Sequence, residues 1–262
     1  MPVPNTATPF GPIKEKVTFK SGDLTLEGFL FKPAGDGPFP ALIWNHGSEQ
    51  YPDQGPEFPG IASVFVPAGY VVFAPVRRGQ GESQGEYISD ATKQEHDTNG
   101  SAAGAALLVK LMETEQLDDQ LAGLDYLKAL PYVDVNRLGV IGCSYGGIQT
   151  LLAAERGAGF KAAVAISPAA ESWNGNKPLR DRLIKAVSGI SIPVFIIHPA
   201  KDVSLEPGKE LAKEFERLGK PYQLKIYPPV GTEAQQGHCF GGAQGNEIWQ
   251  ADVLAFFSQY LQ

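Results

Sequence analysis

The chain has 262 residues, of which 43% are hydrophobic and 19% charged, and its formal net charge is −7 at pH 7. This composition is typical of a globular soluble protein and excludes the disordered and membrane-embedded classes. The acidic balance argues against nucleic acid or an anionic membrane as a partner, and the length favours one large α/β domain over two.

The N-terminal stretch, residues 1–13, predicts an extended arm, and residues 14–262 predict a single domain. The first twelve residues hold four prolines and have neither the basic start nor the apolar core of a secretory signal. No apolar run approaches the length of a membrane span. The two cysteines, Cys143 and Cys239, are too few for a disulfide framework. We therefore expect two free, buried thiols in a cytoplasmic protein.

The pattern opens with a hairpin and a buried strand. Residues 16–20 and 24–32 alternate apolar and polar across a Ser-Gly-Asp turn, which predicts two antiparallel strands. Residues 39–44 form a continuous apolar run, as expected of a strand buried on both faces. The loop that follows contains a glycine, and such a loop supplies a backbone donor for an oxyanion. The Ser48 amide is our choice, with Glu49 as the alternative.

The next part of the chain alternates between clear and unclear patterns. Residues 61–68 predict a weak helix and residues 70–75 a buried strand. Residues 76–83 read as a glycine-rich turn with exposed arginines, and they lack the Gly-Lys-Ser/Thr ending of a phosphate loop. Residues 86–115 begin with a polar loop and end in a helix.

Two histidines in this half are set aside as catalytic bases. His46 lies beside a glycine that must turn, and we expect it to orient its loop through hydrogen bonds. His96 lies among charged and polar residues and reads as a solvated loop residue. Further on, Asp118 and Asp119 predict the cap of a helix that Pro131 stops.

The most informative stretch is a serine between glycines at a strand-to-helix turn. The apolar run 138–141 precedes it, a helical pattern over 148–155 follows it, and its sequence is Gly142-Cys143-Ser144-Tyr145-Gly146. The turn requires a strained, left-handed serine, and the glycines remove side chains that would collide. It projects the Ser144 hydroxyl as a nucleophile and leaves the Tyr145 amide free to bind an oxyanion.

The rest of the chain repeats the alternation of strand and helix. The predicted elements are a strand at 161–166, a small lid or pocket wall at 167–191, a strand at 192–198, a helix from 207 to 218, a strand at 222–227, a glycine-rich loop at 231–245 and a closing helix capped by Asn246. This order predicts a mostly parallel, twisted sheet with helices on both faces, whose site lies at the carboxyl ends of the strands.

A serine nucleophile needs an imidazole base and a carboxylate that orients it. His238, on a glycine-flanked loop after the last strand, is the predicted base, because His198 belongs to the end of a strand. Asp202 is the predicted acid, since it gives the chain order serine, acid, histidine. Glu171, after the preceding strand, is the alternative. No metal-binding pattern and no cofactor motif occurs.

Two segments resemble the α/β-hydrolase superfamily, in its dienelactone hydrolase and prolyl-oligopeptidase-like branch. They are residues 121–147, LAGLDYLKALPYVDVNRLGVIGCSYGG, and residues 69–75, GYVVFAP, with the continuation RGQGES at 78–83. The resemblance implies an eight-stranded α/β-hydrolase fold with a minimal lid. It also implies Ser144, Asp202 and His238 as a triad, with the Tyr145 and Ser48 amides as the oxyanion hole.

The chain departs from the family at two positions. Dienelactone hydrolases proper carry a cysteine where this chain has Ser144, and many relatives have an aspartate where it has Val76. The expected function is hydrolysis of small or medium carboxylic esters without a cofactor. The alternatives are a short-peptide peptidase, which relatives usually supplement with a large extra domain for which this length leaves no room, and a non-catalytic binding protein.

Overall fold

The computed structural model describes residues 13–262, so the arm expected at 1–13 lies outside the described residues except for Ile13. The described residues form one mixed sheet of eight strands in the order β1-β2-β4-β3-β5-β6-β7-β8. The strands are β1 (Ile13–Ser21), β2 (Leu24–Lys32), β3 (Phe39–Asn45), β4 (Val71–Pro75), β5 (Val133–Cys143), β6 (Ala162–Ile166), β7 (Val194–Pro199) and β8 (Tyr222–Tyr227). The β1–β2 hairpin is antiparallel, β2 joins β4 antiparallel, and the remaining pairs are parallel. The expected α/β-hydrolase architecture is confirmed.

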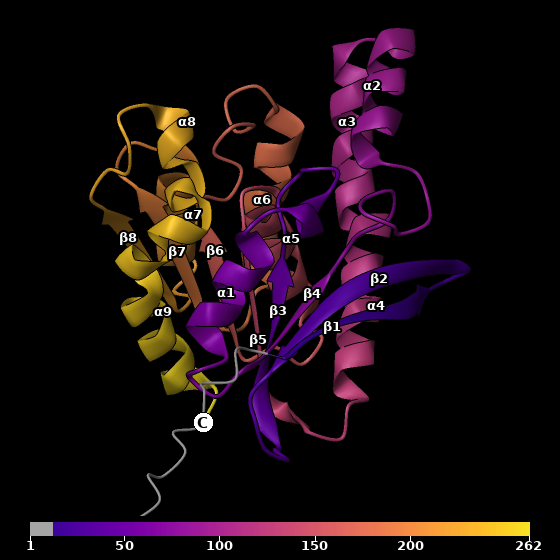
Figure 1. Ribbon diagram of the computed structural model, residues 1–262. Coiled ribbons are helices and arrows are strands. Elements are labelled where there is room, and N and C mark those ends of the chain that lie inside the picture. Colours follow the sequence, from indigo (N-terminus) through magenta and orange to yellow (C-terminus); the bar gives the residue numbers. More distant parts are fainter. Residues whose placement is uncertain (1–12) are drawn as a thin grey trace, which may run out of the picture.

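Helices cover both faces of this sheet (Figure 1). They are α1 (Glu57–Phe65), α2 (Ile88–Asn99), α3 (Ser101–Glu113), α4 (Glu115–Lys128), α5 (Tyr145–Arg156), α6 (Lys177–Gly189), α7 (Glu206–Arg217), α8 (Ala234–Gly237) and α9 (Asn246–Tyr260), with 3-10 turns η1 (Pro52–Gln54) and η2 (His238–Gly245). Helices α1 and α9 pack on one apolar layer, and α3 to α7 pack on the other. None of the helices described here is long and apolar enough to cross a membrane.

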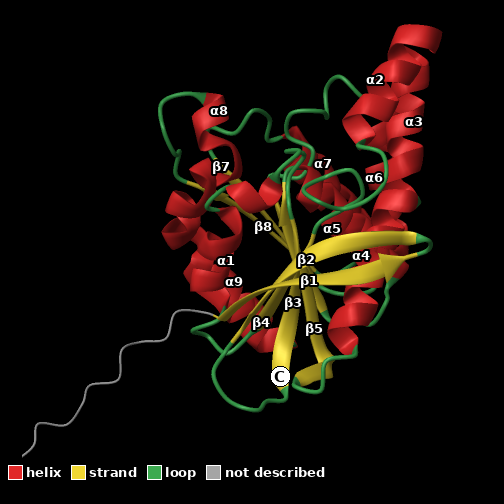
Figure 2. Cartoon of the chain, turned by 45° about the vertical axis from the view of Figure 1, so that its right-hand side comes forward, coloured by secondary structure: helices red, strands yellow, loops and turns green. Residues whose placement is uncertain are grey.

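The inner strands are apolar throughout because successive residues face opposite layers. In β4, Val71 and Phe73 belong to the layer beneath α4, whereas Val72 and Ala74 belong to the layer beneath α1 and α9. The strands were predictable for this reason. Figure 2 shows the same arrangement from the side, with the long β1–β2 hairpin crossing the front of the sheet.

The main difference from the sequence prediction lies between β4 and β5. Residues 88–99 form helix α2, where a polar loop was predicted, and His96 is therefore a helical residue. Ile88 is the only buried residue of this helix, and the helix therefore needs no apolar stripe in its sequence. Helices α2 and α3 stand side by side and project beyond the carboxyl ends of the strands (Figure 1).

Three predicted helix starts also shift. Helix α4 begins at Glu115, so the expected capping residues Asp118 and Asp119 lie inside it, and Asp119 turns inward to accept hydrogen bonds from Ser21 and Arg78. Helix α9 begins at Asn246 itself, with Gly245 in the cap position. Helix α1 begins four residues earlier than predicted, with Pro59 tolerated in its first turn.

Candidate active site

The strand-to-helix turn is formed by the end of β5 and the start of α5. Ser144, between them, has φ 56° and ψ −116°, the left-handed conformation that the sequence predicted. Its amide donates to the Ile166 carbonyl at 2.9 Å. A Cβ on Gly146 would lie 1.9 Å from the Asn45 carbonyl oxygen, and one on Gly142 would lie 2.6 Å from it. Only glycine fits at these two positions, because the loop after β3 passes directly over the turn.

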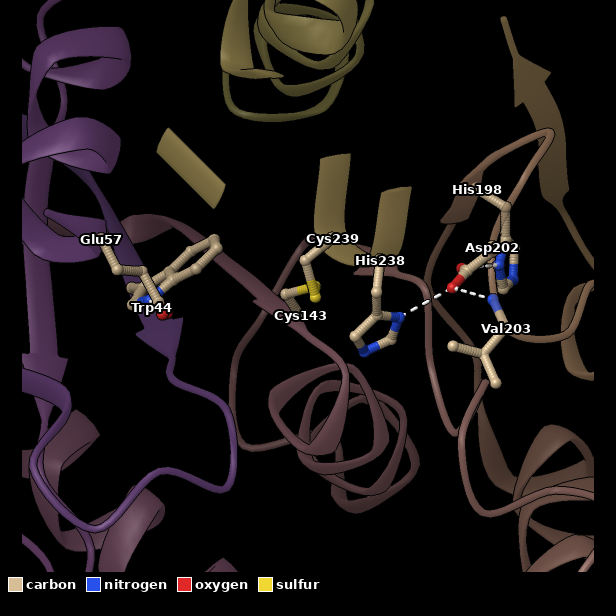
Figure 3. Close-up of a disulfide and its surroundings, with 8 residues drawn as sticks. All are labelled: Trp44, Glu57, Cys143, His198, Asp202, Val203, His238 and Cys239. Carbon is tan, nitrogen blue, oxygen red and sulfur yellow. Dashed lines mark hydrogen bonds and ion pairs between the residues drawn. A yellow bond between two sulfur atoms is a disulfide. The ribbon is translucent and has the colours of Figure 1, made fainter. Parts of the chain in front are cut away.

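Asp202 and His238 are brought together from the loops after β7 and β8. The His238 Nδ1 atom lies 2.7 Å from Asp202 Oδ1, and the Val203 amide donates to the same oxygen at 2.8 Å (Figure 3). The alternative acid, Glu171, is exposed at the edge of the site. The opposite ring atom, His238 Nε2, has no hydrogen-bond partner among the described residues, and His238 lines the same cavity as Ser144.

A second histidine, His198, also bonds Asp202. Its side chain is fully buried at the end of β7, and its Nδ1 atom lies 2.8 Å from Asp202 Oδ2. Burial by itself would raise the pKa of Asp202. Hydrogen bonds from His198 and His238 outweigh burial and hold that pKa well below its usual range. The sequence pattern predicts His198 only as the end of a strand, although its position four residues before Asp202 is a usable signal of this contact.

The loop after β3 is fixed by two buried side chains. Arg77 was expected to be exposed but is 2% exposed, and it donates to the carbonyl oxygens of His46 and Gly47 at 3.0 and 2.5 Å. Its guanidinium lies 4.6 Å from the centre of the Tyr145 ring. Burial lowers the pKa of His46 well below its usual value, and the Arg77 charge lowers it further. His46 is therefore neutral and buried beneath the loop that carries Ser48.

Cys143 and Cys239 form a disulfide, so the expectation of two free thiols is wrong. The two cysteines are 96 residues apart in sequence, and their Cα atoms are 6.0 Å apart. Parallel strands bring their loops to one edge of the sheet, which a count of cysteines does not reveal. The disulfide lies between β5 and the loop of His238, with Trp44 and Glu57 on its other side (Figure 3).

Two cavities meet at Ser144. The larger, which we call the groove, has a volume of about 480 Å³ and lies between the α2–α3 hairpin and α5. The smaller, which we call the side cavity, has a volume of about 190 Å³ and is bounded by the disulfide and by α1 and α9. Ser48, Ser144 and Glu171 line both. The segment 169–172 contributes to the groove wall, as predicted for 167–191, but α6 packs as a covering helix.

The side cavity contains a pair of carboxyl groups. Burial raises the pKa of Glu57 well above its usual value, and the negative charge and hydrogen bond of Glu49 raise it further. The Trp44 indole N–H donates to Glu57 at 2.7 Å. Burial and the neighbouring Glu49 carboxyl therefore both favour the protonated form of Glu57. Within residues 13–262, no group of three or more His, Cys, Asp or Glu side chains is arranged to hold a metal ion.

Comparison with known proteins identifies a family, two related peptidases and a solved esterase structure of similar fold. The model of the dienelactone hydrolase family matches residues 27–260. Dipeptidyl peptidase 8 of Mus musculus is 25% identical over 267 residues, which is 90% of this chain and 27% of that protein. The uncharacterized peptidase YtmA of Bacillus subtilis is 25% identical over 237 residues, 80% of this chain and 82% of that protein.

Among solved structures, the Pyrococcus furiosus esterase Pf2001 is similar with a TM-score of 0.71 at 18% identity, over 99% of this chain and 97% of the esterase. This likeness shows the fold alone. The chain spans about a quarter of the length of dipeptidyl peptidase 8.

Proposed function

Because the chain belongs to the dienelactone hydrolase family, we propose that it is a serine hydrolase that cleaves carboxylic esters of small to medium acyl groups through an acyl-enzyme. The observation that carries this proposal is the left-handed Ser144 at the end of β5, in one cavity with a histidine that is already bonded to a buried aspartate.

In the proposed mechanism, Ser144 Oγ attacks the ester carbonyl while His238 Nε2 takes its proton. Asp202 Oδ1 accepts a hydrogen bond from the Nδ1–H of His238, which leaves Nε2 free as the base, and its charge stabilises the imidazolium that forms. His238 then protonates the leaving alcohol, and a water molecule, activated in the same way, releases the acid from Ser144. No metal or organic cofactor takes part in these steps.

The developing oxyanion is assigned to two backbone amides. Tyr145 is the first residue of α5, so its amide has no hydrogen-bond partner within the helix. This N–H is assigned to the oxygen of the substrate carbonyl that Ser144 attacks. The second donor is the Ser48 amide, with Glu49 as the alternative. Ser48 lines both cavities beside Ser144, and its carbonyl accepts from the Tyr87 hydroxyl at 2.5 Å, which fixes the loop.

The two cavities offer separate places for the two halves of an ester. The side cavity, about 190 Å³, is closed by Trp44, Trp249 and the disulfide, and we assign to it a small acyl group. The groove, about 480 Å³, is more open and is assigned to the alcohol. A small, mostly apolar cavity limits acyl length, because each added methylene must find a place in it.

The second candidate is cleavage of short peptides. Two observations favour it: the peptidase relatives, and the Glu49–Glu57 pair in the side cavity, whose carboxyls would attract a protonated amino terminus. The triad chemistry is the same for both candidates, since His238 protonates either an alcohol or an amine as it leaves.

Initial rates on p-nitrophenyl esters of increasing acyl length, beside a proline-containing aminoacyl p-nitroanilide, separate the two candidates. We expect ester cleavage that falls off steeply beyond a short acyl optimum, and no anilide cleavage. Ser144→Ala should lower kcat by at least about 10⁵-fold with an unchanged far-UV circular dichroism spectrum. Ser188→Ala, at an exposed position near the end of α6 and away from both cavities, is the matched control and should keep its activity within a few-fold. Anilide cleavage would favour the peptidase, and an active Ser144→Ala protein would overturn both.

A further inference from the structure

The loop that carries His238 has an unfavourable backbone. Four successive residues, Cys239 to Gly242, have positive φ angles of 52°, 60°, 69° and 77°. The first two are not glycine, and such residues rarely adopt this conformation unless the surrounding structure holds them there. The segment contains only the four-residue helix α8 and the turn η2, so regular secondary structure does not fix it. Tertiary contacts must keep His238 in place.

Beside the hydrogen bond between His238 and Asp202, three further contacts help to hold the loop. Gly237 packs so closely on the Lys201 backbone that a Cβ would lie 2.5 Å from its carbonyl oxygen. Phe240 is fully buried, with its ring 5.5 Å from that of Tyr227. The third contact is covalent and joins Cys239 to Cys143. This bond connects the loop of His238 directly to the turn of Ser144, because Cys143 precedes Ser144 and Cys239 follows His238.

We propose that the Cys143–Cys239 disulfide is a positioning element that holds His238 over Ser144, and that a dithiol reductant reversibly lowers the rate of turnover by opening it. This inference rests on the proposed roles of Ser144 and His238, but not on the class of substrate. Neither cysteine takes part in the chemical steps.

Opening the bond affects the two ends differently. Cys143 is the last residue of β5 and pairs with Ile166 of β6, and the neighbouring Gly142 pairs with Asn45 of β3. These backbone contacts do not involve the sulfur atoms, so Ser144 keeps its place when the bond opens. Cys239, by contrast, lies in the turn η2 and belongs to no strand. Opening the bond therefore loosens the loop at residues 231–245, which carries His238. The fraction of molecules in which His238 lies over Ser144 falls as a result.

A small reductant can reach the bond through the site itself. Both cysteines line the side cavity together with Ser144, and Cys239 is partly exposed. A thiolate of the dithiol attacks one sulfur and forms a mixed disulfide, and its second thiol then displaces the protein sulfur. The dithiol becomes a cyclic disulfide, and the two electrons and two protons it gives up leave Cys143 and Cys239 as thiols. A ligand in the side cavity should slow this reaction.

The test compares kcat and KM of the full chain before reduction, after reduction with dithiothreitol, and after reoxidation. Thiol alkylation and mass spectrometry count the free cysteines in each sample. We expect the reduced protein to lose at least tenfold in kcat on a short p-nitrophenyl ester, with KM within about twofold and an unchanged far-UV spectrum, and to recover on reoxidation. A purely structural disulfide would lower the melting temperature and leave kcat unchanged. That result, with both thiols shown to be free, would overturn the proposal.

The double variant Cys143→Ala/Cys239→Ala is the control for side effects of the reductant. It should have the kcat of the reduced protein and should not respond to dithiothreitol; a double variant with wild-type kcat would contradict the proposal. Reversible reduction of the wild-type protein gives the same answer should this variant fold poorly.

A fluorophosphonate probe separates this proposal from the proposed function, because it labels an activated serine without requiring the natural substrate. Fast labelling of the oxidised protein and at least tenfold slower labelling of the reduced protein would support the positioning role even if no ester is cleaved. Equal labelling rates would overturn it, and so would an oxidised protein that is not labelled at Ser144.

Discussion

The turn of Ser144 and the loop of His238 each hold a non-glycine residue in an unfavourable backbone conformation, but they do so through different contacts. Both follow a parallel strand of the sheet, and both contain a non-glycine residue at positive φ, which is Ser144 itself in the turn and Cys239, next to His238, in the loop. Ser144 is fixed by its own neighbours in sequence, since β5 ends one residue before it and α5 begins one residue after it. His238 is fixed by residues distant in sequence, through Asp202 and through the disulfide to Cys143. A strained residue can thus be held by local backbone structure or by long-range contacts, and only the first leaves a motif in the sequence.

Among changes that affect these two segments, removal of the Asp202 carboxylate, which holds His238, should have the largest effect after loss of Ser144 itself. Asp202→Asn presents an amide N–H or a weaker acceptor to Nδ1 and favours the wrong tautomer of His238, so we expect kcat to fall by about 10⁴-fold, or about 5 kcal/mol. Asp181→Asn, at an exposed ion pair on α6, is the matched control and should leave kcat unchanged. Steady-state kinetics on the short ester measures both. A loss of less than tenfold would show that Asp202 does not orient the base.

The same variant gives a pH test. The pKa of Asp202 is lower in the folded protein than in the unfolded chain, so the unfolded state binds more protons as the solution is acidified. Its contribution to stability is fully present above the unfolded value of about 4 and is lost as the pH falls towards the folded value. Between pH 5 and pH 3 the wild-type free energy of unfolding should therefore fall by about 1 kcal/mol more than that of Asp202→Asn. Urea unfolding at the two pH values measures this, and equal slopes would contradict it.

Phe240→Ala weakens the loop that carries His238 without changing the disulfide, Ser144, Asp202 or His238. Loss of a fully buried phenylalanine should cost about 3–5 kcal/mol of stability. Phe256→Ala is the matched control, because Phe256 is also buried, 3% exposed, but lies on α9 among other aromatic rings. At a temperature where both variants are folded, kcat should fall several-fold further in Phe240→Ala than in Phe256→Ala. Equal kcat values would show that Phe240 only stabilises the fold.

Gly146→Ala disturbs the turn of Ser144, the other of the two segments. The added methyl would lie 1.9 Å from the Asn45 carbonyl oxygen and 2.7 Å from that of His46, which are backbone atoms at the point where β3 ends and its loop begins. We expect a loss of up to about 3 kcal/mol in stability, together with reduced kcat, because the loop must move away from Ser144. At Gly175 an added methyl meets nothing within 4 Å, so Gly175→Ala should be close to neutral in thermal melting and in kinetics. A fully active Gly146→Ala would refute the close packing.

Much of the fold was predictable because the strands carry their own signal. The hairpin alternates in polarity, and β3, β4, β6 and β7 are continuous apolar runs buried on both faces. Helix α2 was not predictable, since Ile88 is its only buried residue and its sequence resembles a polar loop. Arg77 was misjudged for a related reason. An arginine is exposed in most proteins, and only the carbonyl oxygens of a distant loop make its burial favourable here.

The sequence by itself determined the order of the elements and the turn of Ser144, because glycines, apolar runs and helix signals act over a few residues. It also proposed His238 from its glycine-flanked loop after the last strand, and Asp202 from the order serine, acid, histidine along the chain. Only the tertiary structure decided that His198 shares Asp202, that Arg77 and His46 hold the loop after β3, and that Cys143 bonds Cys239. Each of these contacts joins loops that are separate in sequence and meet because parallel strands bring all their carboxyl ends to one edge of the sheet.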